Sequence, residues 1–430
     1  MSYYKRTADA LLQDLLDAFG AVLIEGPKWC GKTTTASQLA NSILKMQDPS
    51  MRAEYLVTAK TKPSILLQGD TPRLIDEWQD APMLWDAVRT TVDDRQIPGQ
   101  FILTGSNAVD KSQIHHSGAG RIARLRMLPM SLWESQESTG EVSLKELFNN
   151  SDYDIDGKMS KMTIEYLIFA ASRGGWPASL LARTPKAQLL VAKNYVQTIC
   201  SDDISGIDGR KRDAKLTSMI LRAYARNVST LVKKKSLLDD VTSSGEVSCH
   251  VDTFDDYVAA LEKLFVIQNI SAWCPAIRSK TAIRSSVKRC FCDPSIPIAL
   301  LGLSPEALSM QLRTFGFIFE QMCIRDLKAY TIDLNSHVSY YHDRYDLEAD
   351  IVLHLEDGRY ALIECKLGSC EIDDGAKHLL ELKRLIQEHN KTEKQVPIRE
   401  PDLLIVMTGG TMAYTRPDGV KVIPLACLKD

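Results

Sequence analysis

The feature that most constrains this 430-residue chain is the segment 26–33, GPKWCGKT. It fits the pattern G-x-x-x-x-G-K-[ST] at every position, follows an apolar run at 20–25, and precedes a helix-forming stretch from Lys32 to about Lys45. Glycines let backbone N–H groups curl around a phosphate, and Lys32 can then reach the β- and γ-phosphates. The unit therefore predicts a nucleoside-triphosphate site in an α/β domain, in preference to a tight turn that happens to contain lysine.

Three further apolar runs, at 73–77, 100–106 and 123–130, predict more strands of a parallel sheet. The first run ends in Asp76 and Glu77. Asp76 is placed to hold Mg²⁺ through water, and Glu77 to orient and deprotonate an attacking water. The alternative is that both acids simply face solvent at a strand end.

The strand at 100–106 leads into polar side chains, of which Asn107 or Thr104 could sense a γ-phosphate, although a plain strand exit would have the same sequence. Basic residues then alternate with apolar ones before the next strand. Among them, Arg121 or Arg124 could reach the nucleotide of a neighbouring subunit in a homo-oligomer. The alternative is a solvated face of an edge strand.

A second constellation lies near the C-terminal end, where Asp350 precedes Glu364-Cys-Lys366 across a turn containing Asp357-Gly358. Glu364 and Lys366 share one face of their strand. A two-residue loop would pair Asp350 with Cys365, on the other face, whereas a three-residue loop or a bulge would pair it with Lys366 and gather the three side chains. The second register predicts a site where Asp350 and Glu364 bind Mg²⁺ and Lys366 orients a hydrolytic water.

The middle of the chain is rich in basic residues: nine between 208 and 235 and five between 271 and 289. Three short helices followed by a β-ribbon are the order of a winged helix, so these clusters predict contact with DNA phosphates. Against this, the expected recognition helix carries Asp252, Asp255, Asp256 and Glu262, which would repel DNA. The module could instead serve assembly or interdomain packing.

Several motifs together, GPKWCGKTT, RLIDEWQDAP, FILTGSN, GAGRIARLRMLPMSLWE and RGGWP, resemble prokaryotic AAA-like P-loop ATPases. More narrowly, they resemble an archaeal, STAND-related group with a C-terminal domain of unknown function. The resemblance implies that Thr33 and Asp76 bind Mg²⁺ and that segment 174–177 covers the adenine. It implies these nucleotide contacts: Gly26, Pro27, Lys28, Trp29, Cys30, Gly31, Lys32, Thr33, Thr34 and Pro177.

The C-terminal constellation is similar to the PD-(D/E)xK nuclease motif, with Asp350, Glu364 and Lys366 in the matching positions and Ala349 in place of the proline. Glu320 resembles the additional acid that such folds carry on an early helix. A domain of this kind can keep these acids and lose the chemistry, so the resemblance implies the fold more strongly than cleavage.

Composition limits the other possibilities. A net charge of −3 provides no overall basic field, and the ten cysteines have no spacing suited to zinc or a disulfide framework, which predicts a reducing, cytoplasmic location. No uncharged apolar run approaches 20 residues, so neither a membrane span nor a signal peptide is expected. The expected α/β fold has four parts: a P-loop ATPase core (1–140), a helical lid (141–205), a winged helix (206–302) and a restriction-endonuclease-like domain (303–430).

Two functional hypotheses follow. The first is an enzyme that uses ATP and Mg²⁺ to control a DNA-acting, nuclease-like domain. The second is a signalling or assembly ATPase whose nuclease-like domain binds a partner without cutting. Convergence of Asp350, Glu364 and Lys366 favours the first hypothesis, and a splayed register favours the second.

Overall fold

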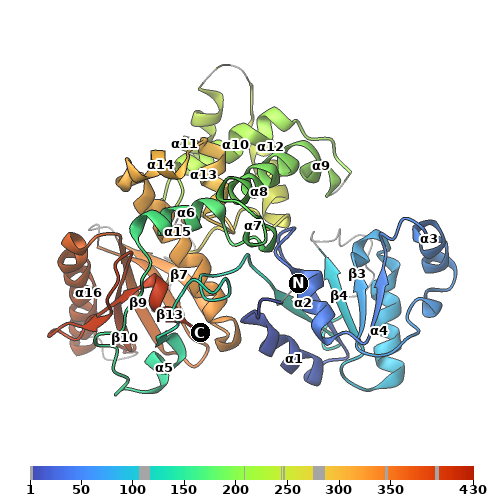
Figure 1. Cartoon of the computed structure of the whole chain (residues 1–430), viewed down its shortest axis with the longest axis horizontal. Helices are drawn as coiled ribbons and strands as arrows, with labels where there is room; N and C mark the ends of the chain where they lie inside the picture. The colour runs from blue at the N-terminus through green and yellow to red at the C-terminus, as the bar shows by residue number, and fades with distance from the viewer. Residues whose placement is uncertain are drawn as a thin grey trace.

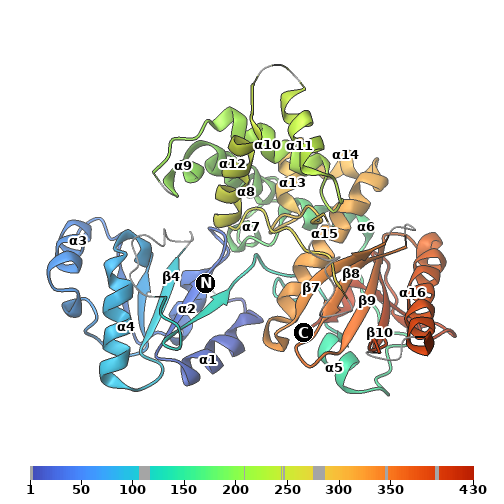
Figure 2. The same cartoon turned by 180° about the vertical axis from the view of Figure 1, so that it is seen from behind.

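A computed structural model describes residues 3–105, 117–207, 209–243, 245, 247–274, 286–343, 347–392 and 397–430. The N-terminal sheet lies on one side of the molecule and the C-terminal sheet on the other (Figure 1). The helices of the middle region span the two (Figures 1 and 2). No helix among the described residues is long and apolar enough to cross a bilayer.

The N-terminal domain is built on a five-stranded parallel sheet of order β2-β3-β4-β1-β5. Buried apolar residues cover both of its faces. Its elements are α1 (Ala8–Ala18), β1 (Ala21–Glu25), α2 (Lys32–Leu39), β2 (Ser42–Lys45), α3 (Arg52–Thr61), β3 (Arg73–Asp76), α4 (Met83–Arg95), β4 (Phe101–Gly105) and β5 (Ile122–Arg126). The predicted parallel sheet is confirmed.

The sheet has one strand more than the sequence predicts. The helix expected to run from Lys32 to about Lys45 stops at Leu39, because Ala40 turns to an extended backbone conformation. The chain then forms the edge strand β2, whose approach is fixed by a hydrogen bond from Asn41 N to Pro72 O. A strand of four residues is too short to show a clear alternation of apolar and polar residues, so β2 could not be recognised after the helical pattern.

The middle region is helical and contains α6 (Ile164–Arg173), α7 (Pro177–Leu180), α8 (Pro185–Thr198), α9 (Ile204–Gly206), α10 (Ala214–Arg226), α11 (Lys234–Thr242), α12 (Val251–Lys263), α13 (Ser295–Leu301) and α14 (Pro305–Ser309). Side chains of Thr163, Thr184 and Asp213 cap the N-termini of α6, α8 and α10. After α12, two antiparallel bridges join segments 266–270 and 288–292, here called the ribbon.

The C-terminal part contains α15 (Leu312–Tyr330), β7 (His337–His342), β8 (Glu348–His354), β9 (Tyr360–Lys366), α16 (Ile372–Thr392), β10 (Leu403–Thr408), β11 (Tyr414–Thr415), β12 (Lys421–Pro424) and β13 (Leu428–Lys429). Strands β7, β8 and β9 form an antiparallel meander, and β10 joins β9 in parallel. In Figure 2, α16 covers one face of this sheet and α15 lies on the other side. The sheet is therefore mixed and enclosed by helices.

The acidic segment 136–161 differs from the surface loop that its composition predicts. It contributes β6 (Val142–Ser143) and α5 (Leu144–Asn149), and β6 pairs in parallel with β13 near the end of the chain. Leu147 and Ile155 join the core shared by the middle region and the C-terminal sheet. Most of its acidic side chains are exposed, although Glu137 is largely buried against Arg173, and a few apolar residues are buried, so average composition hides the packing.

Candidate functional sites

The loop between β1 and α2 has the shape that phosphate binding needs. Gly26 and Gly31 have φ angles of 155° and 101°, which favour glycine. A Cβ on Gly26 would lie 2.2 Å from the carbonyl oxygen of Met127, so no larger residue fits there. Lys32 is buried, and its ammonium donates to the carbonyls of Gly26 (3.0 Å) and Pro27 (2.8 Å). The lysine therefore lies folded within the loop that would receive a phosphate.

Three elements bring oxygen ligands together beside this loop. The hydroxyls of Thr33 on α2 and Thr104 on β4 both donate to Asp76 Oδ1 on β3, at 2.6 Å and 2.7 Å. Hydroxyl and carboxylate oxygens are ligands that Mg²⁺ prefers. This donor set fits the ion, with Thr33 and Asp76 as its holders and Thr104 as the group that orients Asp76.

Glu77 follows β3 in a left-handed conformation, with φ of 55°. Non-glycine residues rarely adopt this region, and doing so costs about 1–3 kcal/mol. The side-chain amide of Gln79 donates to its carboxylate. Burial raises the pKa of Glu77 above its ordinary value, which makes the carboxylate a stronger base.

The other residues predicted for nucleotide sensing lie in different surroundings. Asn107 falls outside the described residues. Arg121 pairs with Asp93 of α4 at 2.7 Å, and Arg124 pairs with Glu25 at 3.1 Å. Both arginines lie on or beside the edge strand β5, and within one protomer they are held by these acids.

The tip of the P-loop is held by the middle region. Lys28 forms an ion pair with Asp203 at 2.6 Å. The ring of Trp29 lies 5.5 Å from that of Tyr195, which in turn lies 4.3 Å from Trp176. Pro177, expected at the adenine end, lies beside Gly31, 3.4 Å from the place of a Cβ there. The segment 174–177 thus contacts the phosphate loop directly.

Sequence reasoning missed a buried pair behind the P-loop. Arg6 donates to the carbonyls of Cys30 (2.8 Å) and Leu128 (2.7 Å) and to Glu134 (2.9 Å). Burial opposes the charge of Glu134, but Arg6 holds the pKa of this carboxyl below its ordinary value. The pair ties the P-loop to the segment that leaves β5. No local pattern marks Arg6, because its partner is 128 positions away.

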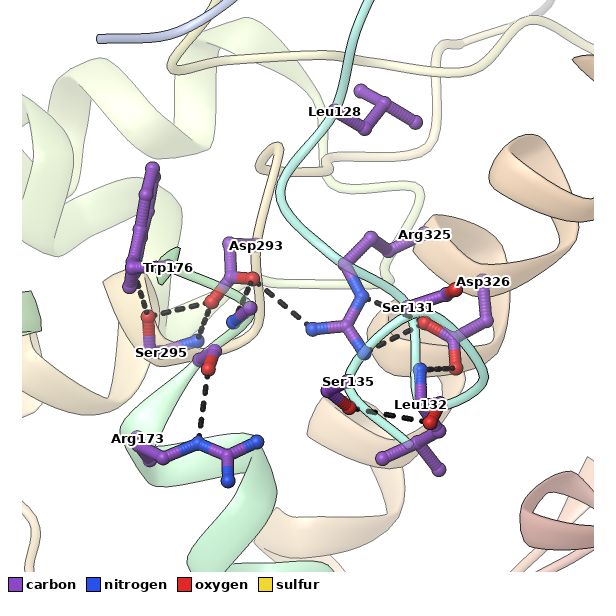
Figure 3. Close-up of polar contacts among 12 residues, drawn as sticks. Leu128, Ser131, Leu132, Ser135, Arg173, Trp176, Asp293, Ser295, Arg325 and Asp326 are labelled. Atoms are coloured by element: carbon purple, nitrogen blue, oxygen red, sulfur yellow. Dashed lines mark hydrogen bonds and ion pairs between the residues drawn. The ribbon is translucent and has the colours of Figure 1, made fainter. Parts of the chain in front are cut away.

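A second buried network, which we call the junction network, joins four parts of the chain (Figure 3). Arg325 of α15 bridges Asp326 (2.6 Å) and Asp293 (3.1 Å). Asp326 accepts from Leu132 N, and Asp293 accepts from Gly175 N, one residue before Trp176. Burial raises the pKa of Asp326 to about 6, against the effect of Arg325. The loop that touches the P-loop is thereby linked to the helix behind the C-terminal sheet.

The C-terminal constellation converges, in a register different from both that the sequence suggested. Ile351 pairs with Ile363, which places Asp350 directly opposite Glu364. A three-residue loop, 356–358, closes this hairpin through the hydrogen bond from Leu355 N to Arg359 O. Directly opposed residues share a face, and so does Lys366, two positions beyond Glu364. The expected pairing of Asp350 with Lys366 is wrong, but the three side chains still meet.

We call Asp350, Glu364 and Lys366 the carboxylate centre. The Lys366 ammonium lies 2.7 Å from Glu364 Oε2, and Cys365 N donates to Asp350 Oδ2 at 2.8 Å. Glu364 is fully buried, and neither of its oxygens has a hydrogen-bond partner of good geometry within the described part of the chain. Burial raises the pKa of Glu364 to about 8, and the charge of Asp350 adds to this rise.

Glu320 of α15 is held by a lysine that the sequence did not suggest. Lys288 of the ribbon forms a buried ion pair with Glu320 and donates to the carbonyl of Asp350 at 3.0 Å. Its ammonium lies 3.8 Å from Asp350 Oδ1. Burial would lower the pKa of Lys288, but the charges of Glu320 and Asp350 raise it. Burial raises the pKa of Glu320 to about 8.

The centre opens on a cavity of about 1130 Å³, lined by Asp350, Lys366 and Glu320 among others. Over the described ranges, no cluster of three or more acidic, histidine or cysteine ligands is assembled for a metal. Two carboxylates are present, and Mg²⁺ is often bound by one or two carboxylates together with waters and substrate phosphates. The buried carboxylate of Glu364, which has Lys366 as its ion-pair partner, fits such an ion.

Much of the basic charge in the middle region is neutralised. Arg210 and Arg212 pair with Asp256 of α12, and Lys234 pairs with Asp255. Arg226 pairs with Asp240, and Arg289 is buried. Asp255 and Asp256 of α12 thus pair with bases of the protein itself. Contact with DNA phosphates stays a prediction, and three of the bases on which it depends, Arg278, Lys280 and Arg284, lie outside the described residues.

Comparison with known proteins matches three separate families to the N-terminal sheet, the helical middle region and the C-terminal sheet. Residues 18–136 match the AAA domain family, 164–307 match a domain of unknown function, DUF8612, and 315–428 match another, DUF4143. Uncharacterised proteins of Mycobacterium bovis and Mycobacterium tuberculosis are each 24% identical over 362 residues, covering 83% of this chain and 72% of theirs.

Among solved structures, the Walker-type ATPase of Pyrococcus abyssi is 13% identical and covers 70% of this chain and 96% of that chain, with a TM-score of 0.42. A DNA replication initiation factor is 12% identical and covers 59% of this chain and 85% of that chain, with a TM-score of 0.27.

Proposed function

We propose that this protein, which has an AAA-family P-loop ATPase domain followed by domains of unknown function, hydrolyses ATP and uses its nucleotide state to control a Mg²⁺-dependent, DNA-acting centre in its C-terminal domain. The observation that carries the second half of the proposal is the convergence of Asp350, Glu364 and Lys366 on one face of the β8–β9 hairpin. Convergence of these side chains is what the nuclease-like hypothesis requires, whereas the hypothesis of a non-cleaving domain expects them to be splayed apart.

At the ATP site, Lys32 leaves the loop carbonyls and contacts the β- and γ-phosphates. Thr33 and Asp76 would hold Mg²⁺, and the ion would offset the negative charge of the phosphates. Water attacks the γ-phosphorus, the bond to the β-phosphate oxygen breaks, and Glu77 takes the proton of the water. The raised pKa of Glu77 and its fixed left-handed backbone support this role.

At the carboxylate centre, Asp350 and Glu364 would hold Mg²⁺, and its charge would stabilise a phosphodiester under attack. Lys366 orients the water that attacks phosphorus. The order of elements supports a PD-(D/E)xK fold: a helix, a three-stranded meander, a second helix, and a strand parallel to the third. Glu320 on the first of these helices would be the additional acid, and it forms an ion pair with Lys288.

Coupling between the two centres has a structural route. The middle region touches the P-loop tip through Asp203, Tyr195 and Pro177. The junction network then joins Gly175 to α15, which also carries Glu320. A nucleotide that moves Lys28 and Trp29 would perturb this path. In a homo-oligomer, Arg121 or Arg124 would leave its acid and contact the nucleotide of a neighbouring subunit.

One observation favours the second candidate, a nucleotide-switched assembly ATPase with a non-cleaving C-terminal domain. Lys288 places a cation between Glu320 and Asp350, where a metal-dependent centre would place its ion. If the Lys288 ammonium always occupies this position, no metal ion can bind between Glu320 and Asp350, and the domain is a binding module. A nuclease would have to displace the lysine.

Metal-dependent cleavage of DNA and RNA, with and without ATP, tests the proposal. Wild type is compared with Glu364→Ala and with Glu371→Ala, since Glu371 is an exposed acid that lines the same cavity outside the centre. Cleavage that is lost in Glu364→Ala and kept in Glu371→Ala supports the nuclease. Absence of cleavage in all three proteins, with ATPase activity intact, supports the binding module.

A further inference from the structure

A cavity of about 750 Å³ lies between the ATPase domain, the ribbon and α15, away from both centres described above. Four cationic side chains line it, and one of them, Lys234, is paired with Asp255; the other three come from separate parts of the chain. They are Arg126 from β5, Arg289 from the ribbon and Lys328 from α15. Neither the P-loop site nor the carboxylate centre uses any of them.

Arg289 is buried, Lys328 is half-buried and Arg126 is exposed, and among the described residues none of the three has a close acidic partner. Within the described chain, the ammonium of Lys328 has no hydrogen bond or ion pair. Arg126 lies 3.9 Å from Glu25, and its guanidinium lies over the ring of Phe265, 5.1 Å from the ring centroid. Arg289 donates to neutral groups, the carbonyl of Val232 and the hydroxyl of Tyr224, both at 3.2 Å. Burial lowers the pKa of Lys328, and the neighbouring charge of Arg126 acts in the same direction.

The acids of the cavity do not balance this charge. Asp255 is paired with Lys234 at 2.8 Å. Glu262 accepts a hydrogen bond from Asn269 at 3.1 Å, and burial raises its pKa, although the charge of Arg289 partly offsets this. The remaining polar lining includes an imidazole and several amide and hydroxyl groups: Gln268, Asn269, Ser271, Thr331, Asn335, Ser336 and His337.

We propose that this cavity binds a phosphate-bearing ligand, with Lys328 and Arg126 as its principal phosphate contacts. A phosphate oxygen would supply the charge that Lys328 lacks, and the planar guanidinium of Arg126 suits paired oxygens. The volume is that of a small-molecule site and exceeds the needs of a single inorganic ion. A ligand in this place would join the ATPase sheet to α15.

The phosphate could belong to a free phosphorylated molecule or to the backbone of a nucleic-acid strand. Calorimetric titration with tripolyphosphate and with single-stranded DNA distinguishes them. The protein carries Lys32→Ala so that the P-loop does not dominate the signal, and Lys328→Met or Arg126→Gln is added. The matched control is Lys186→Met, an exposed lysine on α8.

We expect one tripolyphosphate per chain and at least tenfold weaker binding in Lys328→Met. Arg126→Gln should weaken binding severalfold, and Lys186→Met should change it by less than twofold. Removal of an unpartnered charge should also leave the urea midpoint of Lys328→Met no lower than that of its parent. If that variant fails to fold, Arg126→Gln decides the question.

Lys328-dependent binding of tripolyphosphate alone identifies a free phosphorylated ligand, and Lys328-dependent binding of DNA identifies a strand. The proposal is overturned if neither probe binds the Lys32→Ala protein. It is also overturned if both cavity variants bind as tightly as their parent.

Discussion

Replacing Lys288 by methionine should destabilise the protein in a pH-dependent way. Methionine keeps most of the volume but removes the ammonium that contacts Glu320 and Asp350. Breaking a buried pair from one side costs about 3–5 kcal/mol, because the other charge is left without a partner. Here Glu320 can take up a proton, since burial already raises its pKa to about 8, and loss of the lysine charge raises it further.

Neutralisation of Glu320 limits the cost at low pH. Since its folded-state pKa lies above that of the unfolded chain, the carboxyl stabilises the fold at low pH, and this contribution is lost as the pH rises through the folded-state value. In Lys288→Met the pKa of Glu320 is higher still, so its contribution to stability continues to fall at pH values where that of wild type has already been lost. We therefore expect Lys288→Met to lower the free energy of unfolding by about 2 kcal/mol at pH 6.5 and by about 3 kcal/mol at pH 9.

Urea unfolding followed by circular dichroism, in EDTA and then in Mn²⁺, measures both the cost and its rescue. A divalent ion can take the place of the ammonium, so Mn²⁺ should bind the variant at least tenfold more tightly than wild type. Lys377→Met is the control, because Lys377 forms only an exposed pair with Asp374 on α16 and should matter by less than about 0.5 kcal/mol. Equal stability of Lys288→Met and wild type, with unchanged Mn²⁺ affinity, would refute the reasoning.

Other variants test the remaining assignments. Lys32→Ala should reduce ATP turnover by about 10²-fold or more, and undiminished turnover would contradict the P-loop site. Glu77→Gln should retain nucleotide binding in equilibrium dialysis while losing turnover, and loss of binding would argue against a role as base. Arg6→Ala should lower the free energy of unfolding by about 3–5 kcal/mol in urea titrations, because Glu134 is left buried and unpaired; a neutral effect would contradict the buried pair. The pKa of Glu364 is about 8 in the folded protein, so in the absence of metal this carboxyl stabilises the fold at low pH and loses that effect as the pH rises. Glu364→Gln should therefore flatten the fall in the free energy of unfolding between pH 5 and 8. An unchanged slope would exclude this carboxyl as its source.

The sequence predicts features in which local pattern and chemistry coincide. The P-loop glycines, the acids after β3 and the Glu364–Lys366 spacing each depend on residues that are close in the chain. The three-residue loop of the β8–β9 hairpin is one of two options that the turn residues permit, but the pairing predicted for it is wrong. A loop of 356–358 closes at Leu355 and Arg359, and continuing that register along both strands brings Asp350 opposite Glu364. The sequence does favour the correct face, since side chains two apart on a strand point the same way.

The remaining features depend on contacts between distant residues. Lys288 looks like one more base in a basic segment until the ribbon brings it beside Glu320, 32 positions away. The basic segment 208–235 gives a second example, because Arg212 pairs with Asp256 of α12, 44 positions later. Local charge counts cannot reveal which opposite charges the fold brings together.

The pairing of β6 with β13 also limits the order in which the chain can fold. Ser138 donates to the carbonyl of Leu428, 290 positions later. The segment that leaves the ATPase domain therefore cannot complete its packing until the last strand has been synthesised, whereas the N-terminal sheet has all of its strands by Arg126. On the ribosome, the ATPase domain would form first and carry an unfinished segment behind it. Loss of the final strand should then leave a folded nucleotide-binding domain with exposed apolar residues at 142–162, a surface prone to aggregation.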